Sequence, residues 1–307
     1  MKLSFVIPTY NEAGNVVPLF NEIKDVMASM KHSYEVLFVN DGSRDGTQKK
    51  LESLQKDYPE TVKAIEFTHN FGKASALSAG FKYATGDTIV TMDADGQDDP
   101  HELHKLLDKL NEGYDMVSGW KHNRKDSFVK NNTSKLFNVA TNSISKVKLH
   151  DFNCGFKVYK ADVAKGINLY GELHRYIPVL VAAQGYSVAE VQVEHRKRLN
   201  GKTKYGGIRF IHGFLDLITV LFITKFRARP LHLFGYMGLI FFSGGFLIGT
   251  YLTIVKVFGH QSIGERPLLL FAVMLMIMGV QVGVMGLVGE QITTILQKNE
   301  QSYQVKK

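Results

Sequence analysis

The sequence predicts an α/β domain with a Rossmann-like parallel sheet, followed by an interfacial helix and a two-helix transmembrane hairpin. Short β-branched runs alternate with longer amphipathic stretches over the first 118 residues or so. Two apolar stretches without charge follow near the C-terminus. At 307 residues, with 45% hydrophobic and 21% charged residues, the chain is long enough for one globular core plus a membrane segment.

The first part of the chain carries strand and helix patterns in alternation. The expected strands, rich in β-branched and aromatic residues, are Leu3–Ile7, Tyr34–Val39, Val62–Phe67, Thr88–Met92 and Asp115–Val117. The expected helices, with apolar residues at helical spacing, are Asn15–Met30, Thr47–Tyr58, Lys73–Ala84 and Pro100–Asn111. This alternation is typical of a parallel sheet with crossover helices.

The two apolar stretches predict membrane-spanning helices. Leu231–Val255 contains no Lys, Arg, Asp or Glu over 25 residues, and Leu268–Gly289 contains none over 22. At ~1.5 Å per residue, either stretch can cross a hydrocarbon core about 30 Å thick. The loop Lys256–Pro267 is short enough for a hairpin. The alternative is a helical pair buried in a soluble core, which the length and lack of charge disfavour.

The flanks of the two spans predict an orientation. Basic residues precede the first span and follow the second: Lys225, Arg227, Arg229, Lys298, Lys306 and Lys307. The positive-inside rule therefore places both termini and the α/β domain in the cytoplasm. Ile208–Phe226 mixes aromatic, aliphatic and a few charged residues, as interfacial helices do. We expect an α/β domain over 1–206, the interfacial helix over 207–229, and the spans with a short cytoplasmic tail over 230–307.

Polar clusters follow the predicted strands. They are Pro8–Glu12, Asn40–Ser43, His69–Lys73 and Asp93–Gln97. Ligands of such sheets bind outside the carboxyl ends of the strands, so these clusters predict one shared site. No G-x-G-x-x-G follows the first strand, so the sequence gives no support for a dinucleotide cofactor.

Asp93 and Asp95 are the strongest chemical signal. Two carboxylates one residue apart at a strand end can share a hard divalent cation, which in turn bridges the oxygens of a diphosphate. Many acidic turn residues only solvate a loop. The position after an apolar strand, near the other polar clusters, favours the metal interpretation. For Pro8–Glu12 and Asn40–Thr47, turn formation and helix capping remain an alternative to ligand binding.

The formal net charge of +8 predicts an anionic partner. Lys121–Lys135 has five Lys or Arg against one Asp, and His195–Arg209 has six against none. Both segments suit phosphate binding, although a solvated basic face explains the first equally well. Nucleic-acid binding would explain the charge but neither the hairpin nor the acidic strand ends, so we expect no nucleic-acid partner.

Taken together, these motifs resemble a known family. PTYNE at 8–12, NDGSRDGT at 40–47 and DADGQDDP at 93–100 resemble the nucleotide-sugar domain of family 2 glycosyltransferases, the GT-A fold. HNFGK at 69–73, HDFNCGFKVY at 150–159 and RLNGKTKYG at 198–206 are similar to motifs of the polyprenyl-phosphate branch, which includes dolichyl-phosphate mannose synthase and undecaprenyl-phosphate glucosyltransferases. The Q-x-x-R-W signature of processive synthases is missing, since Trp120 is the only tryptophan. A single-transfer enzyme is therefore predicted.

The resemblance implies roles for individual residues. The nucleotide-sugar donor would bind at Pro8, Tyr10, Glu12, Asp41, Gly42, Ser43, Lys73 and Asp93. Asp41 would lie near the base and Asp93 near the ribose, while Asp95 and Gln97 would hold Mg²⁺ or Mn²⁺. The catalytic set would be Asp95, Asp151, Arg198 and Lys204, and the acceptor phosphate would meet Arg124, Lys125, Arg198 and Lys204. Asp151 would face the acceptor, although it could equally cap the following strand.

The resemblance also implies the reaction. We expect inverting, metal-dependent transfer of one hexose, from a donor of the UDP-glucose or GDP-mannose type, to a polyprenyl phosphate at the membrane. One alternative is a family 2 transferase that uses a lipid-linked saccharide or diacylglycerol. A non-catalytic membrane scaffold that binds sugar nucleotides is the other. A homo-oligomer is a further hypothesis about the partners.

Overall fold

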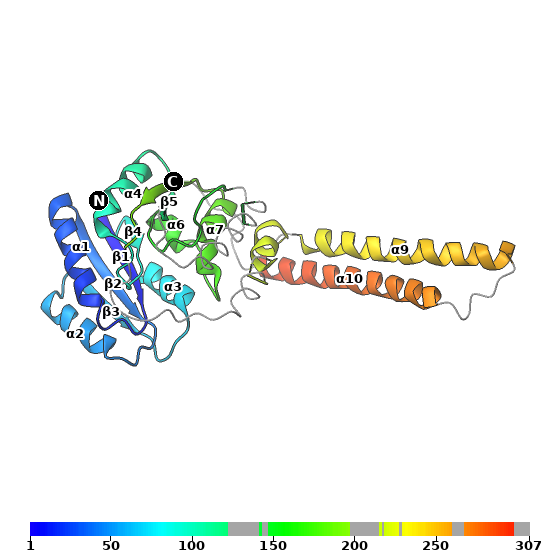
Figure 1. Ribbon diagram of the computed structural model, residues 1–307, viewed down its shortest axis with the longest axis horizontal. Coiled ribbons are helices and arrows are strands. Elements are labelled where there is room, and N and C mark those ends of the chain that lie inside the picture. Colours follow the sequence, from blue (N-terminus) through cyan, green and yellow to red (C-terminus); the bar gives the residue numbers. More distant parts are fainter. Residues whose placement is uncertain are drawn as a thin grey trace. The chain divides into compact units, whose positions relative to one another are not determined.

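The computed structural model describes residues 1–121, 141–142, 147–196, 215–216, 218–226, 229–259 and 267–297. The chain forms two compact units, Met1–Val220 and Leu221–Lys307. The first is an α/β domain, and the second contains two long helices (Figure 1).

A seven-stranded sheet with the order β3-β2-β1-β4-β6-β5-β7 organises the first unit. Its strands are β1 Lys2–Thr9, β2 Ser33–Asn40, β3 Val62–Glu66, β4 Thr88–Thr91, β5 Met116–Lys121, β6 Lys157–Lys160 and β7 Val188–Val193. The five predicted strands are confirmed, and all five run in the same direction. Strand β6 lies between β4 and β5 and is antiparallel to both, which makes the sheet mixed.

Helices cover both faces of the sheet. They are α1 Val16–Met30, α2 Thr47–Asp57, α3 Lys73–Tyr83, α4 Leu103–Asn111 after the 3₁₀ turn η1 Pro100–Glu102, α6 Ala161–Lys165, and α7 Ile177–Ala183 after η2 Leu173–Tyr176. Alternate β1 residues Leu3, Phe5 and Ile7 join the core under α1, α2 and α4. On the other face α3 packs so closely that a Cβ on Gly80 would overlap Val6. The result is a three-layer α/β/α domain (Figure 1).

A buried carboxylate joins three strands at the end opposite the polar clusters. Glu35 on β2 is 1% exposed and accepts hydrogen bonds from Ser4 Oγ (2.6 Å) and Lys63 Nζ (2.7 Å). The Thr85 N–H and hydroxyl also donate to it, at 2.6 and 2.8 Å. Burial alone would raise the pKa of Glu35, but these donors lower it to about 2.

The second unit is a hairpin of α9 Pro230–Gly259 and α10 Pro267–Gln297. Small residues recur at seven-residue spacing among its buried positions, namely Gly238 and Gly245 on α9 and Ala272, Gly279 and Gly286 on α10. A Cβ on Gly238 would lie 2.6 Å from the Gly279 carbonyl oxygen, so only glycine permits this backbone approach. Leu231 N–H donates to Glu290 (3.2 Å), which caps the start of α9.

Both helices are long and apolar enough to cross a membrane. Only 17% and 11% of their most apolar windows are buried, and Leu239, Leu247 and Leu270 are more than 60% exposed. A helical pair inside a soluble core would bury these side chains, so that alternative is wrong. The spans predicted at 231–255 and 268–289 lie within α9 and α10, which continue beyond them.

The expected interfacial helix falls largely outside the described residues. Within the predicted 207–229, the structure describes 215–216, 218–226 and 229. Residues 218–221 are helical, and the π-helical turn η3 Phe222–Phe226 follows. The predicted boundary at 206 lies outside the described residues, as does the tail after Gln297.

Candidate active site

The predicted site residues come from the carboxyl ends of parallel strands. Thr9 and Asn40, the last residues of β1 and β2, pair with each other, and Asp93 follows β4. The turns after β1 and β2 are joined directly: Asn11 N–H donates to Ser43 Oγ (2.9 Å), and Glu12 N–H donates to Thr47 Oγ1 (2.9 Å). Both turns therefore lie together at the carboxyl ends of β1 and β2.

Asp41 holds the turn after β2 against the segment after β3. It is 4% exposed, and its carboxylate accepts the N–H groups of Phe71 (2.7 Å) and Gly72 (2.9 Å). Burial raises the pKa of Asp41, and the two amides oppose that rise in part. A Cβ on Gly42, where φ is +68°, would lie 2.5 Å from the His69 carbonyl carbon. The NDGS and HNFGK motifs thus form one packed unit.

A hollow of about 180 Å³ lies beside this unit. Its lining residues are Tyr10, Gly42, Ser43, Arg44, Glu66, Phe67, Thr68, His69 and Asn70. Three of them, Tyr10, Gly42 and Ser43, were predicted to bind the donor. The aromatic residues Phe67 and His69 were not predicted as binding residues, although His69 belongs to a motif that was recognised. A flat aromatic ring could bind among such side chains.

Asp93 lies in a positively charged environment. Its carboxylate forms an ion pair with Lys73 Nζ, and both side chains are 30% exposed. Burial alone would raise the pKa of Asp93, but Lys73, Lys121 and Lys157 together hold it below its ordinary value. A Cβ on Gly155 would lie 2.6 Å from the Asp93 carboxyl carbon, so glycine is needed there. The structure therefore brings together two of the predicted donor residues, Lys73 and Asp93.

Hydrogen bonds and an ion pair hold the acidic loop after β4 in place. Asp95 is 8% exposed and accepts the Gln97 N–H at 3.1 Å, which closes a turn. Asp98, 1% exposed, accepts the Asp93 N–H (3.1 Å) and pairs with Lys121 Nζ (2.7 Å). Asp95 and Gln97 offer a carboxylate and an amide oxygen from the same turn. These hard oxygen donors fit Mg²⁺ or Mn²⁺.

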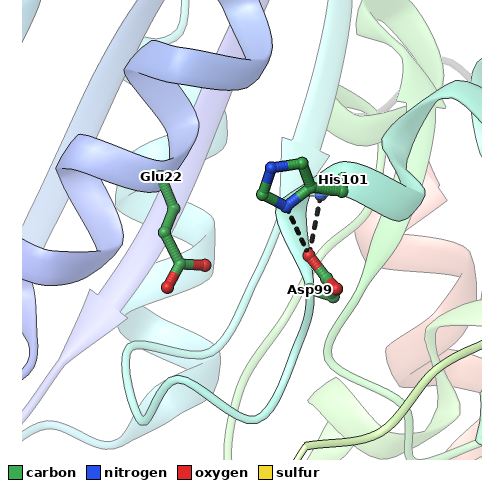
Figure 2. A group of neighbouring side chains, drawn as sticks. All are labelled: Glu22, Asp99 and His101. Atoms are coloured by element: carbon green, nitrogen blue, oxygen red, sulfur yellow. Dashed lines mark hydrogen bonds and ion pairs between the residues drawn. The ribbon is translucent and has the colours of Figure 1, made fainter.

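A second acidic cluster lies nearby, and the side chain of an arginine forms ion pairs with it. Glu22, Asp99 and His101 place ligand atoms within 4.8 Å of one another, and Figure 2 shows His101 bonded to Asp99 with Glu22 opposite. The guanidinium of Arg196 pairs with Glu22 (2.7 Å) and with Asp99 (2.5 Å). Because one guanidinium neutralises both carboxylates, this cluster is an arginine site and a weaker candidate for a metal than the Asp95 turn.

Arg196 also ties its own segment to the acidic loop. Its N–H donates to the Gln97 carbonyl (3.0 Å), and the neighbouring His195 forms a β-bridge with Asp98. The motif RLNGKTKYG begins two residues later. Its predicted phosphate ligands Arg198 and Lys204 lie outside the described residues, as do Arg124 and Lys125.

Asp151 occupies a buried turn. It is 1% exposed, accepts the Asn153 N–H (3.0 Å), and donates its own N–H to Glu190 (2.9 Å). These bonds close the turn around Asp151, and both the acceptor-facing role and the strand-capping alternative stay predictions. Residues Asn153 to Lys157 continue from this turn into β6 and approach Asp93 through Gly155.

Two further side chains near Asp93 were missed by sequence reasoning. Lys157 and His174 line a small cavity that Asp93 and Lys73 also line. Lys157 belongs to the motif HDFNCGFKVY, so a charged residue in an otherwise apolar run could have drawn attention to it. His174 had no such signal, because a single histidine before a short apolar helix is common.

Family comparisons agree with this architecture. Residues 4–167 match the model described as Glycosyl transferase family 2, and residues 229–295 match the GtrB C-terminal hairpin. A dodecaprenyl-phosphate galacturonate synthase of Rhizobium johnstonii is 35% identical, covering 98% of this chain and 90% of the relative. An undecaprenyl-phosphate 4-deoxy-4-formamido-L-arabinose transferase of Klebsiella pneumoniae is 34% identical, covering 96% of this chain and 89% of the relative.

Solved structures show the same fold. A mannosyl-3-phosphoglycerate synthase from Rubrobacter xylanophilus aligns with a TM-score of 0.58 and 18% identity, over 73% of this chain and 75% of that one. A glucosyl-3-phosphoglycerate synthase from Mycobacterium tuberculosis, in complex with Mn²⁺ and UDP-glucose, aligns with a TM-score of 0.54 and 15% identity, over 73% and 78%. The α/β domain has the GT-A fold, and the chain belongs to glycosyltransferase family 2, with the C-terminal hairpin of the GtrB type.

Proposed function

We propose that this enzyme transfers one sugar residue from a nucleotide diphosphate-sugar to a polyprenyl phosphate, with inversion and with Mg²⁺ or Mn²⁺ as cofactor. The observation that carries the proposal is the braced acidic turn at Asp95 and Gln97, which follows β4 in a chain of family 2. Both relatives named above act on polyprenyl phosphates and align over nearly the whole chain, hairpin included.

The donor would bind across the carboxyl ends of β1, β2 and β4. Its base fits the hollow beside Tyr10, Gly42 and Ser43. The carboxylate of Asp41 accepts two backbone N–H groups beside this hollow. A carboxylate has about four acceptor sites, so Asp41 could also accept a hydrogen bond from the base. Pro8 on β1, Glu12 in the turn after β1 and Asp93 after β4 would lie along the ribose and diphosphate.

The acidic turn would hold the diphosphate. Asp95 and Gln97 would bind the metal, which when present stabilises the charge on the departing nucleoside diphosphate. A lipid-phosphate oxygen attacks the anomeric carbon, a new carbon–oxygen bond forms, and the bond to the diphosphate breaks. Because that oxygen is already ionised at pH 7, Asp151 is proposed to orient the acceptor side of the site rather than to act as a strong base.

The lipid acceptor requires a membrane surface. The apolar helices α9 and α10 support membrane association. We propose that the basic residues at both flanks keep the catalytic domain and the termini in the cytoplasm. Arg124, Lys125, Arg198 and Lys204 are proposed to bind the acceptor phosphate, since Arg and Lys recognise phosphate oxygens.

The identity of the sugar is a separate question. The relatives' names contain galacturonate and 4-deoxy-4-formamido-L-arabinose, so the comparisons give no support to the glucose or mannose donors that the sequence suggested. Another membrane acceptor, such as diacylglycerol, is disfavoured by the same names. The homo-oligomer stays a prediction.

The proposal is tested by removing the metal ligand. Asp95→Asn keeps the size of the side chain but removes its charge, so we expect turnover in detergent with polyprenyl phosphate to fall by about 10²–10³-fold. The matched control is Asp108→Asn on the exposed side of α4. Full turnover in Asp95→Asn, or activity that resists chelation of Mg²⁺ and Mn²⁺, would remove the metal assignment.

A further inference from the structure

A small polar cavity lies directly beside Asp93. Its polar lining comes from Lys73, Asp93, Asn153, Lys157 and His174, and its volume is about 20 Å³. A cavity needs roughly 10–15 Å³ to hold one water-sized group. The cavity therefore has room for one small substituent and not for a whole sugar ring.

Polar atoms in this cavity lack partners. Among the described residues, His174 Nδ1 and Asn153 Oδ1 are buried and have no hydrogen-bond partner. Lys157 is 3% exposed, and the one hydrogen bond that the described part of the chain gives its ammonium is to the Cys154 carbonyl. Buried polar groups are nearly always paired, so such a cluster indicates a polar ligand.

The lining of the cavity carries more positive than negative side chains. Asp93 forms its ion pair with Lys73, and within the described residues Lys157 pairs with no carboxylate. Burial lowers the pKa of Lys157 and holds that of His174 well below its ordinary value. An anionic group beside Lys157 would offset the unfavourable burial of its charge. The neutral imidazole of His174 can bond to an oxygen of the same group.

The cavity's position assigns its ligand. Asp93 is proposed to contact the donor nucleotide, and Asp151, at the start of the segment that continues to Lys157, is proposed to face the acceptor. The group that passes between donor and acceptor is the transferred sugar. We propose, resting on the function proposed above, that this cavity receives a carboxylate of that sugar, so that the donor is a nucleotide diphosphate-hexuronate.

The small size of the cavity favours a carboxylate over the larger phosphates of the reaction. A carboxylate is planar and presents two oxygens, so it is smaller than a tetrahedral phosphate and suits a cavity of about 20 Å³ better. A neutral hydroxymethyl group would fit, but it would leave Lys157 without a counter-charge. The carboxylate satisfies both the volume and the charge.

The test compares matched donors that differ only in this group. The purified full chain is given polyprenyl phosphate, Mn²⁺ and three donor pairs: UDP-glucuronate and UDP-glucose, UDP-galacturonate and UDP-galactose, GDP-mannuronate and GDP-mannose. For at least one pair we expect kcat/KM to favour the uronate. Lys157→Gln should lower kcat/KM for that uronate by roughly 10- to 100-fold, as the loss of a charged hydrogen bond does, and leave the neutral partner nearly unchanged.

Two variants separate recognition from folding. Lys157→Arg should restore part of the preference, because it keeps the charge. Lys160→Gln, on the same strand but paired with Asp115, should leave the preference intact. The affinity for the free nucleoside diphosphate should be the same in Lys157→Gln as in the parent.

Two results would overturn this inference and leave the proposed function standing. One is a higher kcat/KM for the neutral donor in every pair. The other is an equal fall in kcat/KM for both members of a pair in Lys157→Gln. The equal loss would point to a phosphate at Lys157. Absence of lipid product from all six donors would overturn the proposed function and this inference with it.

Discussion

Lys73, Lys121 and Lys157 approach the loop after β4 from three different elements, α3, β5 and β6. Lys73 pairs with Asp93 and Lys121 with the fully buried Asp98. The result is a carboxylate, Asp93, whose pKa lies below its ordinary value, so it stays ionised throughout the physiological range. The positive charges of Lys73 on α3 and Lys121 on β5 are held in place by these ion pairs, which suits a site that must stabilise a diphosphate without first rearranging.

Glu35 gives a prediction on stability. Its pKa is about 2 in the folded chain against an ordinary value of 4.5, so it stabilises the fold above pH 4.5, and this contribution is lost as the pH falls toward 2. The shift corresponds to a free energy on the order of 3 kcal/mol. We expect Glu35→Gln to lower the Tm at pH 7 and to flatten the dependence of Tm on pH between 5 and 3.

The control for Glu35 is Glu52→Gln, an exposed side chain on α2. It should leave the Tm at pH 7 within experimental error of the parent. If Glu35→Gln and the parent lose stability equally on acidification, the Glu35 cluster is not the source of the acid sensitivity.

The helices of the hairpin give a prediction at the level of elements. A Cβ on Gly245 would lie 2.5 Å from the Ala272 carbonyl oxygen, whereas a Cβ on the neighbouring Gly244 would meet no atom within 4 Å. Gly245→Val should therefore force α9 and α10 apart and destabilise the hairpin by about 1–3 kcal/mol. Gly244→Val adds the same side chain to the open side of the helix and should have little effect.

Thermal unfolding and resistance of the hairpin to proteolysis in detergent measure the difference. Equal stability of the Gly244→Val and Gly245→Val proteins would mean that the helices do not pack through this glycine.

The elements also show what the sequence could predict. β1, β2 and β4 are apolar runs that end at polar clusters, and the pattern predicts both their position and the location of the site at their carboxyl ends. β6 was not predicted, because Lys157–Lys160 has a lysine at each end and only two residues between them. A buried charge within a strand breaks the hydrophobic pattern, and such breaks occur where a strand serves a ligand.

Contacts between residues far apart in sequence could not be predicted from the motifs. The metal-binding roles proposed for Asp95 and Gln97 come from a motif within one turn, which resembles the family's motif. The pairing of Arg196 with Glu22 and Asp99 joins residues far apart in sequence, and a motif does not reveal it. The cavity at His174 likewise depends on η2 meeting β4 and β6, which only the tertiary structure provides.

At the scale of the whole molecule, a GT-A domain and an apolar hairpin are joined in one chain with a net charge of +8. The charge suits an enzyme whose donor and acceptor both carry phosphates, and the hairpin suits an acceptor that stays in the bilayer. These two features explain why a nucleotide-sugar domain and membrane helices occur together here.

The most direct test of this account is the mass of the lipid product. Purified protein in detergent is incubated with polyprenyl phosphate, Mn²⁺ and the nucleotide-sugar panel, and the lipid is analysed by mass spectrometry. We predict a lipid heavier by a single anhydro-sugar unit, formed one for one with nucleoside diphosphate and lost on chelation of the metal. Release of nucleoside diphosphate with unchanged lipid, or addition of two or more sugars, would contradict it.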